Sequence, residues 1–305
     1  MLPRAEPSPV LPADWLVPDW PAPAGVHALC TARSGGVSAA PYASCNLGDH
    51  VGDNPAAVRA NRARLTDALQ AVTPGTRPVF LRQVHGHCVL SLSAATADGA
   101  EADASVTTET AVACTIMVAD CLPVLLAHAC GLAVAAAHAG WRGLAGQGGR
   151  GVLEAVFEQF CAVTHDVNHF DATISIANSK NLAGPHTQAA AARAAVADQT
   201  LAWLGPCIGP TAFEVGVEVR EAFCGANPGA AACFVAHAGH RGKFLCDLAG
   251  LARLRLQSLG ITRIYGNDGS APWCTVTNAS RFFSHRHGSA RGEGSGRFAA
   301  CIWKG

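Results

Sequence analysis

The chain has 305 residues, of which 50% are hydrophobic and 14% are charged, and its 22 basic and 22 acidic side chains cancel to a formal net charge of zero. This composition excludes an intrinsically disordered chain, which needs low hydrophobicity and high net charge. It also argues against nucleic acid or an anionic membrane as a partner, because both are captured by a surplus of lysine and arginine. At about 150 residues per domain, the length allows one large or two small domains.

The first elements are predicted from turn and capping residues. Residues 1–25 form a proline-rich lead without the apolar core of a signal peptide, so we expect no secretion signal there. Residues 26–33 are typical of a short strand, and 34–54 of a glycine-rich loop. A helix should follow, because Asn54 suits its N-cap and Pro55 its first turn.

Compact apolar runs bounded by turn residues come next, and runs of this length are typical of strands covered on both faces. They are residues 78–86, 87–92, 111–120, 121–129 and 131–140. Polar residues such as Asp120 and His128 interrupt the most apolar part. We therefore expect buried strands and no membrane-spanning helix.

The second half continues with alternating helices and strands. A glycine-rich turn at 143–151 precedes a helix, and residues 163–200 differ in composition, which indicates an inserted, partly helical segment. Residues 201–210 predict a strand followed by a turn. Asp247 should cap a last helix that stops at Gly260, and the segments ITRIY and RFAACIW are expected late strands. The whole predicts one mixed α/β domain over 26–305, with a large sheet flanked by helices.

Thirteen cysteines are scattered along the chain without a CxxC pair. An odd number without a secretion signal indicates reduced thiols in a cytosolic protein, so we expect a cytoplasmic location.

Three chemically active side chains stand at the ends of predicted strands: His85 in RQVHG, Cys121 in ADCLPV and His138 in HAGWRG. Two imidazoles and a thiolate suit Zn²⁺ and leave a fourth position for water or substrate. Their spacing alone does not define a metal motif. The alternatives are a cysteine nucleophile activated by histidine, or a buried cysteine with two unrelated, hydrogen-bonded histidines.

Charged neighbours extend this hypothesis. Asp120 precedes the cysteine, and since strand neighbours point to opposite faces, we expect it to orient a ligand or the backbone rather than to bind metal. Asp103 is either a similar acid or a turn cap. Arg142 and Arg33 each lie beside glycines in turns, a combination that suits phosphate.

Several segments together resemble the laccase-domain family, described both as polyphenol oxidases and as purine nucleoside phosphorylases. QVHG, ADCLPV and HAGWRG form its specific core. The matching stretches are TARSGGVS (31–38), PYASCNLGDHVGDN (41–54), NRARL (61–65), RQVHG (82–86), EADAS (101–105), ADCLPVLL (119–126), AAAHAGWRGL (135–144), LGPCIGPTAFEVGVEVREAF (204–223) and RFFSHRHG through GRFAACIW (281–303).

The resemblance implies an α/β sandwich with mixed sheets and outer helices, and a catalytic zinc site made of His85, Cys121 and His138. It implies phosphorolysis of adenosine, inosine and S-methyl-5'-thioadenosine to a free base and a (methylthio)ribose 1-phosphate, together with deamination of adenosine. Purine nucleosides and inorganic phosphate are the implied partners. Asn46 joins Asp120 and the two arginines as a candidate substrate contact.

Three departures from the family pattern stand out: a longer turn at 146–150, the segment 163–200, and a tail with His285 where the family tends to have tyrosine. If this tail lines the pocket, it affects substrate preference.

Two other enzyme classes and a non-catalytic binding module stay open. A copper phenol oxidase would use the same two histidines and cysteine, but a multicopper enzyme also needs further histidines, and only two HxH pairs occur, at 85–87 and 285–287. A cysteine hydrolase acting on cell-wall precursors would use Cys121 as its nucleophile.

Overall fold

The computed structural model describes residues 12–172 and 185–305. Its strands are β1 (Val26–Cys30), β2 (Arg77–Phe80), β3 (Val89–Ser91), β4 (Ala104–Thr107), β5 (Val112–Val118), β6 (Leu122–His128), β7 (Val134–Ala139), β8 (Thr200–Leu204), β9 (Glu214–Gly216), β10 (Phe234–Ala236), β11 (Lys243–Cys246), β12 (Arg263–Gly266) and β13 (Phe298–Lys304). The α-helices are α1 (Pro55–Val72), α2 (Trp141–Ala145), α3 (Val152–Ala172), α4 (Pro185–Asp198), α5 (Val217–Cys224), α6 (Leu248–Ser258) and α7 (His285–Ala290), and two short 3₁₀ turns are η1 (Pro228–Cys233) and η2 (Ala271–Trp273).

Two large sheets pack face to face. One has the strand order β1-β13-β5-β2 and the other β12-β8-β6-β7-β4-β3, while β10-β11-β9 form a small third sheet. Strand β5 shows how the sequence produces this packing. Val112, Ile116 and Val118 enter the core between the two sheets, whereas Ala113 and Met117 face the opposite way. Both faces of β5 are thus buried, as its run of apolar residues, interrupted by Thr115 alone, predicts.

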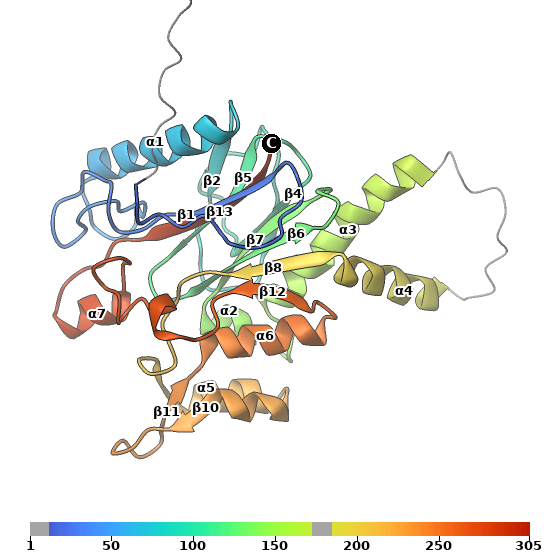
Figure 1. The fold of residues 1–305 in the computed structure, drawn as a ribbon. Coiled ribbons are helices and arrows are strands. Elements are labelled where there is room, and N and C mark those ends of the chain that lie inside the picture. Colours follow the sequence, from blue (N-terminus) through green and yellow to red (C-terminus); the bar gives the residue numbers. More distant parts are fainter. Residues whose placement is uncertain (1–11, 173–184) are drawn as a thin grey trace, which may run out of the picture.

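Helices cover both outer faces of the sheet pair (Figure 1). Leu65 and Leu69 of α1 pack with Trp303 of β13, on the four-stranded sheet. Phe157 of α3 and Leu256 of α6 belong to the core against the six-stranded sheet. The result is a sandwich with the layer order helix, sheet, sheet, helix, which confirms the predicted α/β sandwich of mixed sheets and flanking helices.

Capping residues set the helix boundaries that the sequence indicates. The Asn54 Oδ1 accepts hydrogen bonds from the backbone N–H groups of Ala56 and Ala57 at the start of α1. The Asp247 Oδ1 accepts from the Gly250 N–H at the start of α6, and Gly260 beyond its end has a φ of +89°. A left-handed φ of this kind favours glycine, which explains why the helix stops there.

Two predicted elements differ from those observed. The strand expected over 78–86 ends at Phe80, because the backbone N–H groups of 84–86 bond to a buried carboxylate instead of to a neighbouring strand. The first residues of the turn expected over 143–151 belong instead to helix α2, which begins at Trp141 and ends at Ala145.

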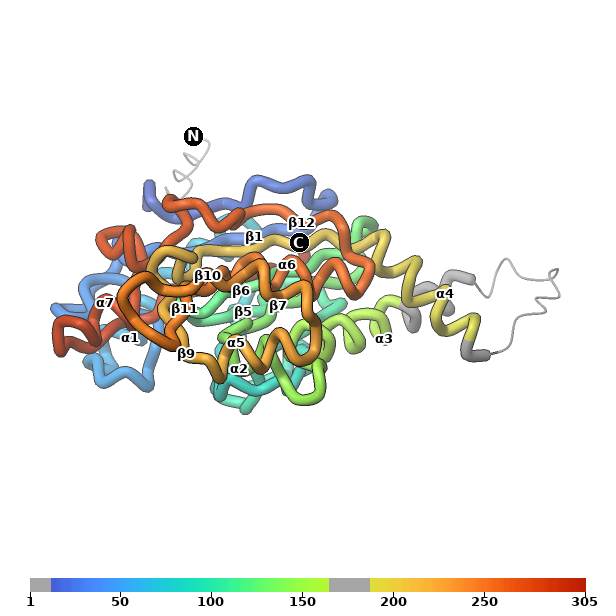
Figure 2. Tube along the Cα trace, turned by 90° about the horizontal axis from the view of Figure 1, so that it is seen from below, coloured from blue at the N-terminus to red at the C-terminus, as the bar shows by residue number. Residues whose placement is uncertain are grey.

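The expected insertion at 163–200 contains the end of α3 and all of α4, which projects from the body of the molecule (Figures 1 and 2). Residues 173–184 of this segment lie outside the described part. At the other end of the chain, Leu16 of the proline-rich lead exchanges two backbone hydrogen bonds with Cys30 of β1. Within the described residues, no helix is both long enough and apolar enough to cross a membrane.

Asn61 fastens the long loop 34–54 to helix α1, which packs on the four-stranded sheet. Its side chain is fully buried, accepts from the Val37 N–H at 2.9 Å, and donates to the Ser38 hydroxyl and to the carbonyls of Ser44 and Asn46. Every polar atom of this amide therefore has a partner inside the protein. The loop is a defined structure, and it carries Asn46 to the edge of the sandwich.

We expect Asn61→Ala to lower the free energy of unfolding by about 3 kcal/mol, because it removes four hydrogen bonds and leaves the buried Asn46 carbonyl without its partner. Urea denaturation followed by circular dichroism measures this change. Arg59→Ala, an exposed position on the same helix, serves as the control and should change stability by less than about 0.5 kcal/mol. Equal stabilities of the two variants would contradict this role of Asn61.

Candidate functional site

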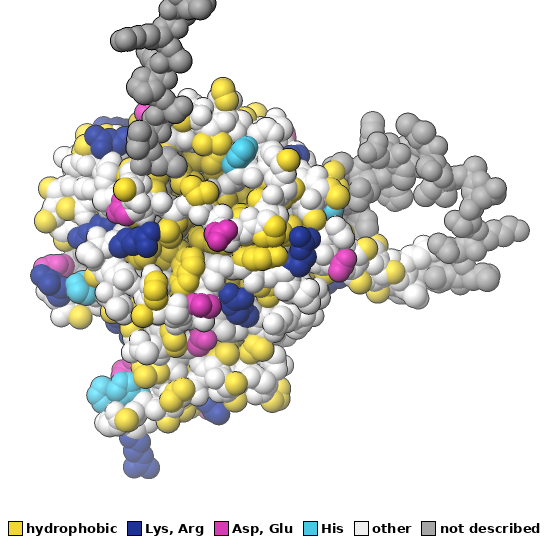
Figure 3. All heavy atoms as spheres, in the orientation of Figure 1, with side chains coloured by type: hydrophobic (Ala, Val, Ile, Leu, Met, Phe, Trp, Pro, Cys, Tyr) yellow, Lys and Arg dark blue, Asp and Glu magenta, His cyan; other side chains and the backbone are white. Residues whose placement is uncertain are grey.

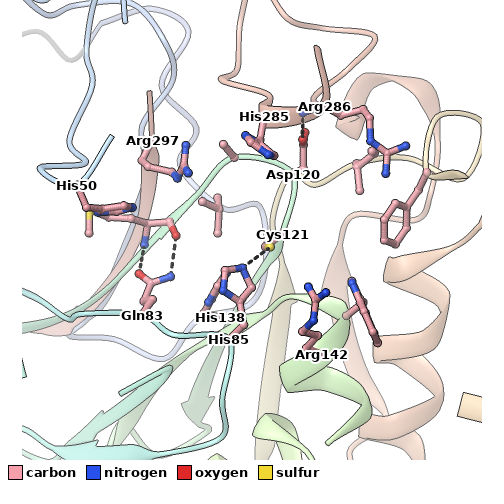
Figure 4. A pocket seen from close by; sticks show the side chains of 16 residues that line it. His50, Gln83, His85, Asp120, Cys121, His138, Arg142, His285, Arg286 and Arg297 are labelled. Carbon is pink, nitrogen blue, oxygen red and sulfur yellow. Dashed lines mark hydrogen bonds between the residues drawn. The ribbon is translucent and has the colours of Figure 1, made fainter. Parts of the chain in front are cut away.

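A cavity of about 410 Å³ opens where strands of both large sheets end (Figure 4). Cys121 lies in its wall, in the short connection by which the chain leaves β5 of one sheet and enters β6 of the other. His138 stands near the end of β7, opposite Pro123 of β6. His85 comes from the turn after β2. Rigid strands thus position side chains around a hollow that solvent reaches.

The structure brings His85, Cys121 and His138 together, in the grouping that the resemblance implies. The His85 Nε2 lies 3.7 Å from the Cys121 Sγ, and one donor atom from each of the three residues lies within 4.8 Å of the other two. The neighbouring Gly140 has to be a glycine: a Cβ there would lie 2.9 Å from the His85 ring and 3.0 Å from the Cys121 Sγ. The close approach of the three donor atoms therefore requires a residue without a side chain at position 140.

A buried carboxylate connects the two histidines. Asp103, immediately before β4, is fully buried, and its Oδ1 lies 2.8 Å from the His138 Nδ1. The same carboxylate accepts backbone N–H groups from Val84, His85 and Gly86. Asp103 thus combines the two roles that the sequence left open, because it caps the turn and also orients an imidazole. With Nδ1 held in this way, the Nε2 of His138 faces Cys121.

These contacts determine the charges of the site. Burial opposes ionisation of the Cys121 thiol, but His138 and His85 outweigh that effect and lower its pKa to about 6. Burial also disfavours the charged form of His138, yet the Cys121 thiolate and the Asp103 carboxylate raise its pKa to about 9. Near neutral pH the metal-free site therefore contains a thiolate beside an imidazolium. A thiolate is the form that binds metal or attacks carbon.

Asp120 points away from the three donors, as expected for its position before Cys121. One carboxylate oxygen accepts from the Thr275 hydroxyl and the other from the Arg286 backbone N–H, both at 2.6 Å. The backbone of Asp120 has a φ of +86° and that of His85 a φ of +62°. Such values are strained for residues other than glycine and mark positions that the surrounding structure holds in place.

Of the two arginines that the sequence suggests for phosphate binding, only Arg142 lies in the cavity wall. Arg142 lines the cavity and stacks on the Trp141 ring. Arg33 is not part of the cavity wall, and its guanidinium donates to the carbonyls of Pro41, Ala43 and Ala279. It stabilises the loop 34–54, and each of its three side-chain nitrogens donates to a backbone carbonyl.

Asn46 does not line the cavity itself but holds the backbone of a residue that does. It is fully buried and absent from the cavity wall, and its Oδ1 accepts a hydrogen bond from the backbone N–H of Arg297, which does line the cavity. The burial of the Arg297 guanidinium lowers its pKa, although the charges of Cys121 and Asp120 act in the opposite direction. Its Nη1 donates to two nearby carbonyls, and its remaining N–H groups have no hydrogen bond within the described residues.

Several wall residues were not singled out as site residues from the sequence. They are His50, Gln83, Arg286 and Arg297, together with His285 of the altered tail. Gln83 belongs to the RQVHG motif, and its amide exchanges two 2.8 Å hydrogen bonds with the backbone of Met117 at the end of β5. Figure 4 shows the guanidinium groups of Arg142 and Arg297 directed into the cavity from opposite sides of Cys121.

Known proteins resemble the chain over nearly its whole length. The sequence model of the family described as multi-copper polyphenol oxidoreductase laccase matches residues 27–182 and 179–305. Two proteins named purine nucleoside phosphorylase, from Pseudomonas aeruginosa and Escherichia coli, are 44% and 42% identical to it. Alignment with the first covers 95% of this chain and 98% of the relative, and with the second 94% and 98%.

Solved structures agree with this relationship. A Neisseria meningitidis protein is 40% identical to this chain and superposes with a TM-score of 0.71. The alignment covers 95% of this chain and 99% of that protein. YlmD from Geobacillus stearothermophilus is 27% identical, with a TM-score of 0.66 and 92% of each chain covered. The chain is therefore a member of the laccase-domain family.

Proposed function

We propose that this protein is a zinc-dependent purine nucleoside phosphorylase. It would convert adenosine, inosine and S-methyl-5'-thioadenosine with phosphate to the free base and the (methylthio)ribose 1-phosphate, and would also deaminate adenosine to inosine. The observation that carries the proposal is the convergence of His85, Cys121 and His138 in the wall of a cavity that also presents guanidinium groups. The names of the relatives from Pseudomonas aeruginosa and Escherichia coli support it.

The donor set fits a zinc ion. His85 and His138 would supply nitrogen and Cys121 sulfur, which is a combination that Zn²⁺ favours in catalytic sites with one open position. When bound, the ion supplies Lewis acidity at that open position. Asp103 holds the His138 ring in the orientation needed for ligation. A histidine binds metal in its neutral form. Binding of zinc would therefore release the proton that His138 carries beside the Cys121 thiolate when no metal is bound.

Phosphate would bind to the guanidinium groups of Arg142 and Arg297, with the Arg286 side chain at the edge of the same cavity. Guanidinium forks match phosphate oxygens, and the free N–H groups of Arg297 are available for them. Arg286 is partly engaged, because it donates to the carbonyls of Ala212 and Glu214. Arg33 has no part in this proposal, since its donors are used by the loop.

The nucleoside would occupy the apolar part of the wall. Trp141, Phe213 and Ile208 line the cavity and offer flat or aliphatic surface to a purine. In phosphorolysis a phosphate oxygen forms a bond to the ribose C1′ as the bond from C1′ to the purine nitrogen breaks, and the leaving base takes up a proton. A cavity of about 410 Å³ lies in the size range of small-molecule sites, roughly 300–1,000 Å³.

The chain is also proposed to work in the cytoplasm. All thirteen of its cysteines lie in the described part, and all are free thiols. This agrees with a reducing compartment.

Copper-dependent phenol oxidation, which the family description names, finds less support. Among the described residues, only two groups of three or more His, Cys, Asp or Glu side chains bring their donor atoms within 4.8 Å. One is the His85, Cys121 and His138 set, and the other contains no cysteine. Metal analysis of purified protein that finds copper instead of zinc would revive this alternative.

We expect Cys121→Ala and His138→Ala to reduce phosphorolysis of inosine by at least about a hundredfold, because each removes a ligand. Hypoxanthine release from inosine and phosphate, with zinc content measured in parallel, provides the test. His87→Ala is the matched control, since this exposed histidine does not line the cavity. Full activity in Cys121→Ala would disprove the proposed site.

Arg297→Gln should raise the KM for phosphate about tenfold or more and change the KM for inosine much less, because it removes a charged phosphate contact. Initial rates at varied phosphate and saturating inosine measure the effect. Arg82→Gln, an exposed arginine outside this cavity, is the control. An unchanged phosphate KM would show that Arg297 does not hold the anion.

In metal-free protein, alkylation of Cys121 should accelerate as the pH rises through about 6 and then level off, because the thiolate forms there rather than near pH 9. Below pH 6 the rate should fall about tenfold per pH unit, since the protonated thiol is unreactive. Mass spectrometry of the peptide that contains Cys121 follows the reaction, and bound zinc should suppress it. A metal-free protein that hydrolyses a cell-wall precursor until Cys121 is alkylated would instead indicate a cysteine hydrolase.

A further inference from the structure

A second group of potential metal ligands lies outside the cavity, on the small sheet. Glu214 is the first residue of β9, while His237 and His240 belong to the turn that joins β10 to β11. Imidazole groups gather beside an acidic side chain at the lower edge of the molecule, where this small sheet lies (Figure 3). The spacing HAGH places two residues between the histidines.

The three side chains already converge on one point. The His240 Nδ1 lies 2.5 Å and the His237 Nε2 3.7 Å from the Glu214 Oε2, and one ligand atom of each lies within 4.8 Å of the other two. The two imidazole rings stack at 4.4 Å with an interplanar angle of 12°. A nitrogen atom of each ring is directed at the same carboxylate oxygen, so three potential ligand atoms lie around one point.

Backbone contacts hold the histidines in this arrangement. Within the turn, the His240 N–H donates to the His237 carbonyl, and the Lys243 N–H donates to the His240 carbonyl. The His237 Nδ1 lies 3.0 Å from the Ala238 carbonyl, which accepts its proton and leaves the lone pair on Nε2, the atom that faces Glu214. Fixing one ring nitrogen on a carbonyl is the common way in which proteins prepare the other for metal.

We propose that Glu214, His237 and His240 form a second metal site, which binds a divalent transition ion of the zinc class. Two imidazoles and one glutamate are a ligand set that Zn²⁺ uses, with a position left open for water or a further ligand. With ligands about 2.0–2.2 Å from the ion, tetrahedral donors stand about 3.4 Å apart. The pair of His240 and Glu214 must therefore separate by about 1 Å, and the 60% exposed His240 side chain has room to move.

The site should be weaker than the one that contains Cys121. It lacks a thiolate, its ligands are partly exposed, and the Lys243 ammonium also acts on Glu214. We expect micromolar affinity for Zn²⁺. The ion would fasten the hairpin of β10 and β11 to β9, and β9 borders the cavity, because Phe213 lines it and Arg286 donates to the Glu214 carbonyl at 3.1 Å.

Metal titration of the full chain tests the proposal independently of its enzymatic activity. Zn²⁺ titrated by calorimetry should bind with two equivalents in the wild type and with one in the His237→Ala/His240→Ala double variant. The Cys121→Ala/His138→Ala variant should keep the weaker equivalent alone. Arg241→Ala, in the same turn but without a ligand atom in the cluster, should bind two.

Co²⁺ distinguishes the sites by their ligands. Co²⁺ bound to the Cys121→Ala/His138→Ala variant should lack the strong near-ultraviolet band of cobalt–thiolate charge transfer. In the same variant, added Zn²⁺ should slow the hydrogen exchange of the backbone amides of residues 234–246. Failure of the Cys121→Ala/His138→Ala variant to bind Zn²⁺, or a second equivalent that persists in the His237→Ala/His240→Ala variant, would overturn the proposal.

Discussion

The buried Asp103 carboxylate is the constraint on which the site depends. It lies at the start of β4 with no exposure to solvent, so it has to satisfy its oxygens inside the protein. Three backbone N–H groups of the turn 84–86 and the His138 imidazole do so. One residue thereby fixes both the loop that carries His85 and the ring of His138. Loss of this carboxylate would leave four donors unpaired and release two of the three converging side chains at once.

Three non-glycine residues in the described part of the chain have a positive φ; two of them, His85 and Asp120, lie at the site, and the third is Ala111. His85 and Asp120 both have positive φ values, although neither is a glycine. The backbone of His85 is held in this conformation because its N–H donates to the Asp103 carboxylate. Asp120 lies where the chain crosses from one sheet to the other, and its carboxylate accepts a hydrogen bond from the backbone N–H of Arg286 at the start of α7. Conformations of this kind cost about 1–3 kcal/mol each and persist only where surrounding contacts over-determine them. The contacts that impose the strain are the same ones that direct the imidazole and the thiolate toward each other.

The sequence was sufficient for elements governed by local chemistry. Capping by Asn54 and Asp247 and the apolar runs of β5, β6 and β7 depend on residues close in the chain, and the structure contains them. The grouping of His85, Cys121 and His138 was implied by the resemblance of QVHG, ADCLPV and HAGWRG to the laccase-domain family, whereas their positions near predicted strand ends left it open. Other features were not accessible, since they depend on contacts between distant segments: Asp103 reaches His138 across 35 positions, and Arg297 is placed by Asn46 across 251. Spacing along one chain carries no information about such pairings.

The cationic side of the cavity is coupled to the same framework by single hydrogen bonds. Arg297 is placed through its own backbone N–H on Asn46, and Arg286 through its N–H on Asp120, the residue next to Cys121. Arg142 follows His138 at the start of α2, directly after β7. The backbones of these arginines are thus fixed relative to the thiolate, and their guanidinium groups form no ion pair with the described residues that an anion would have to break. Under the proposed function, phosphate would meet positive charge whose position is already set, so little reorganisation would oppose its binding beside His85, Cys121 and His138.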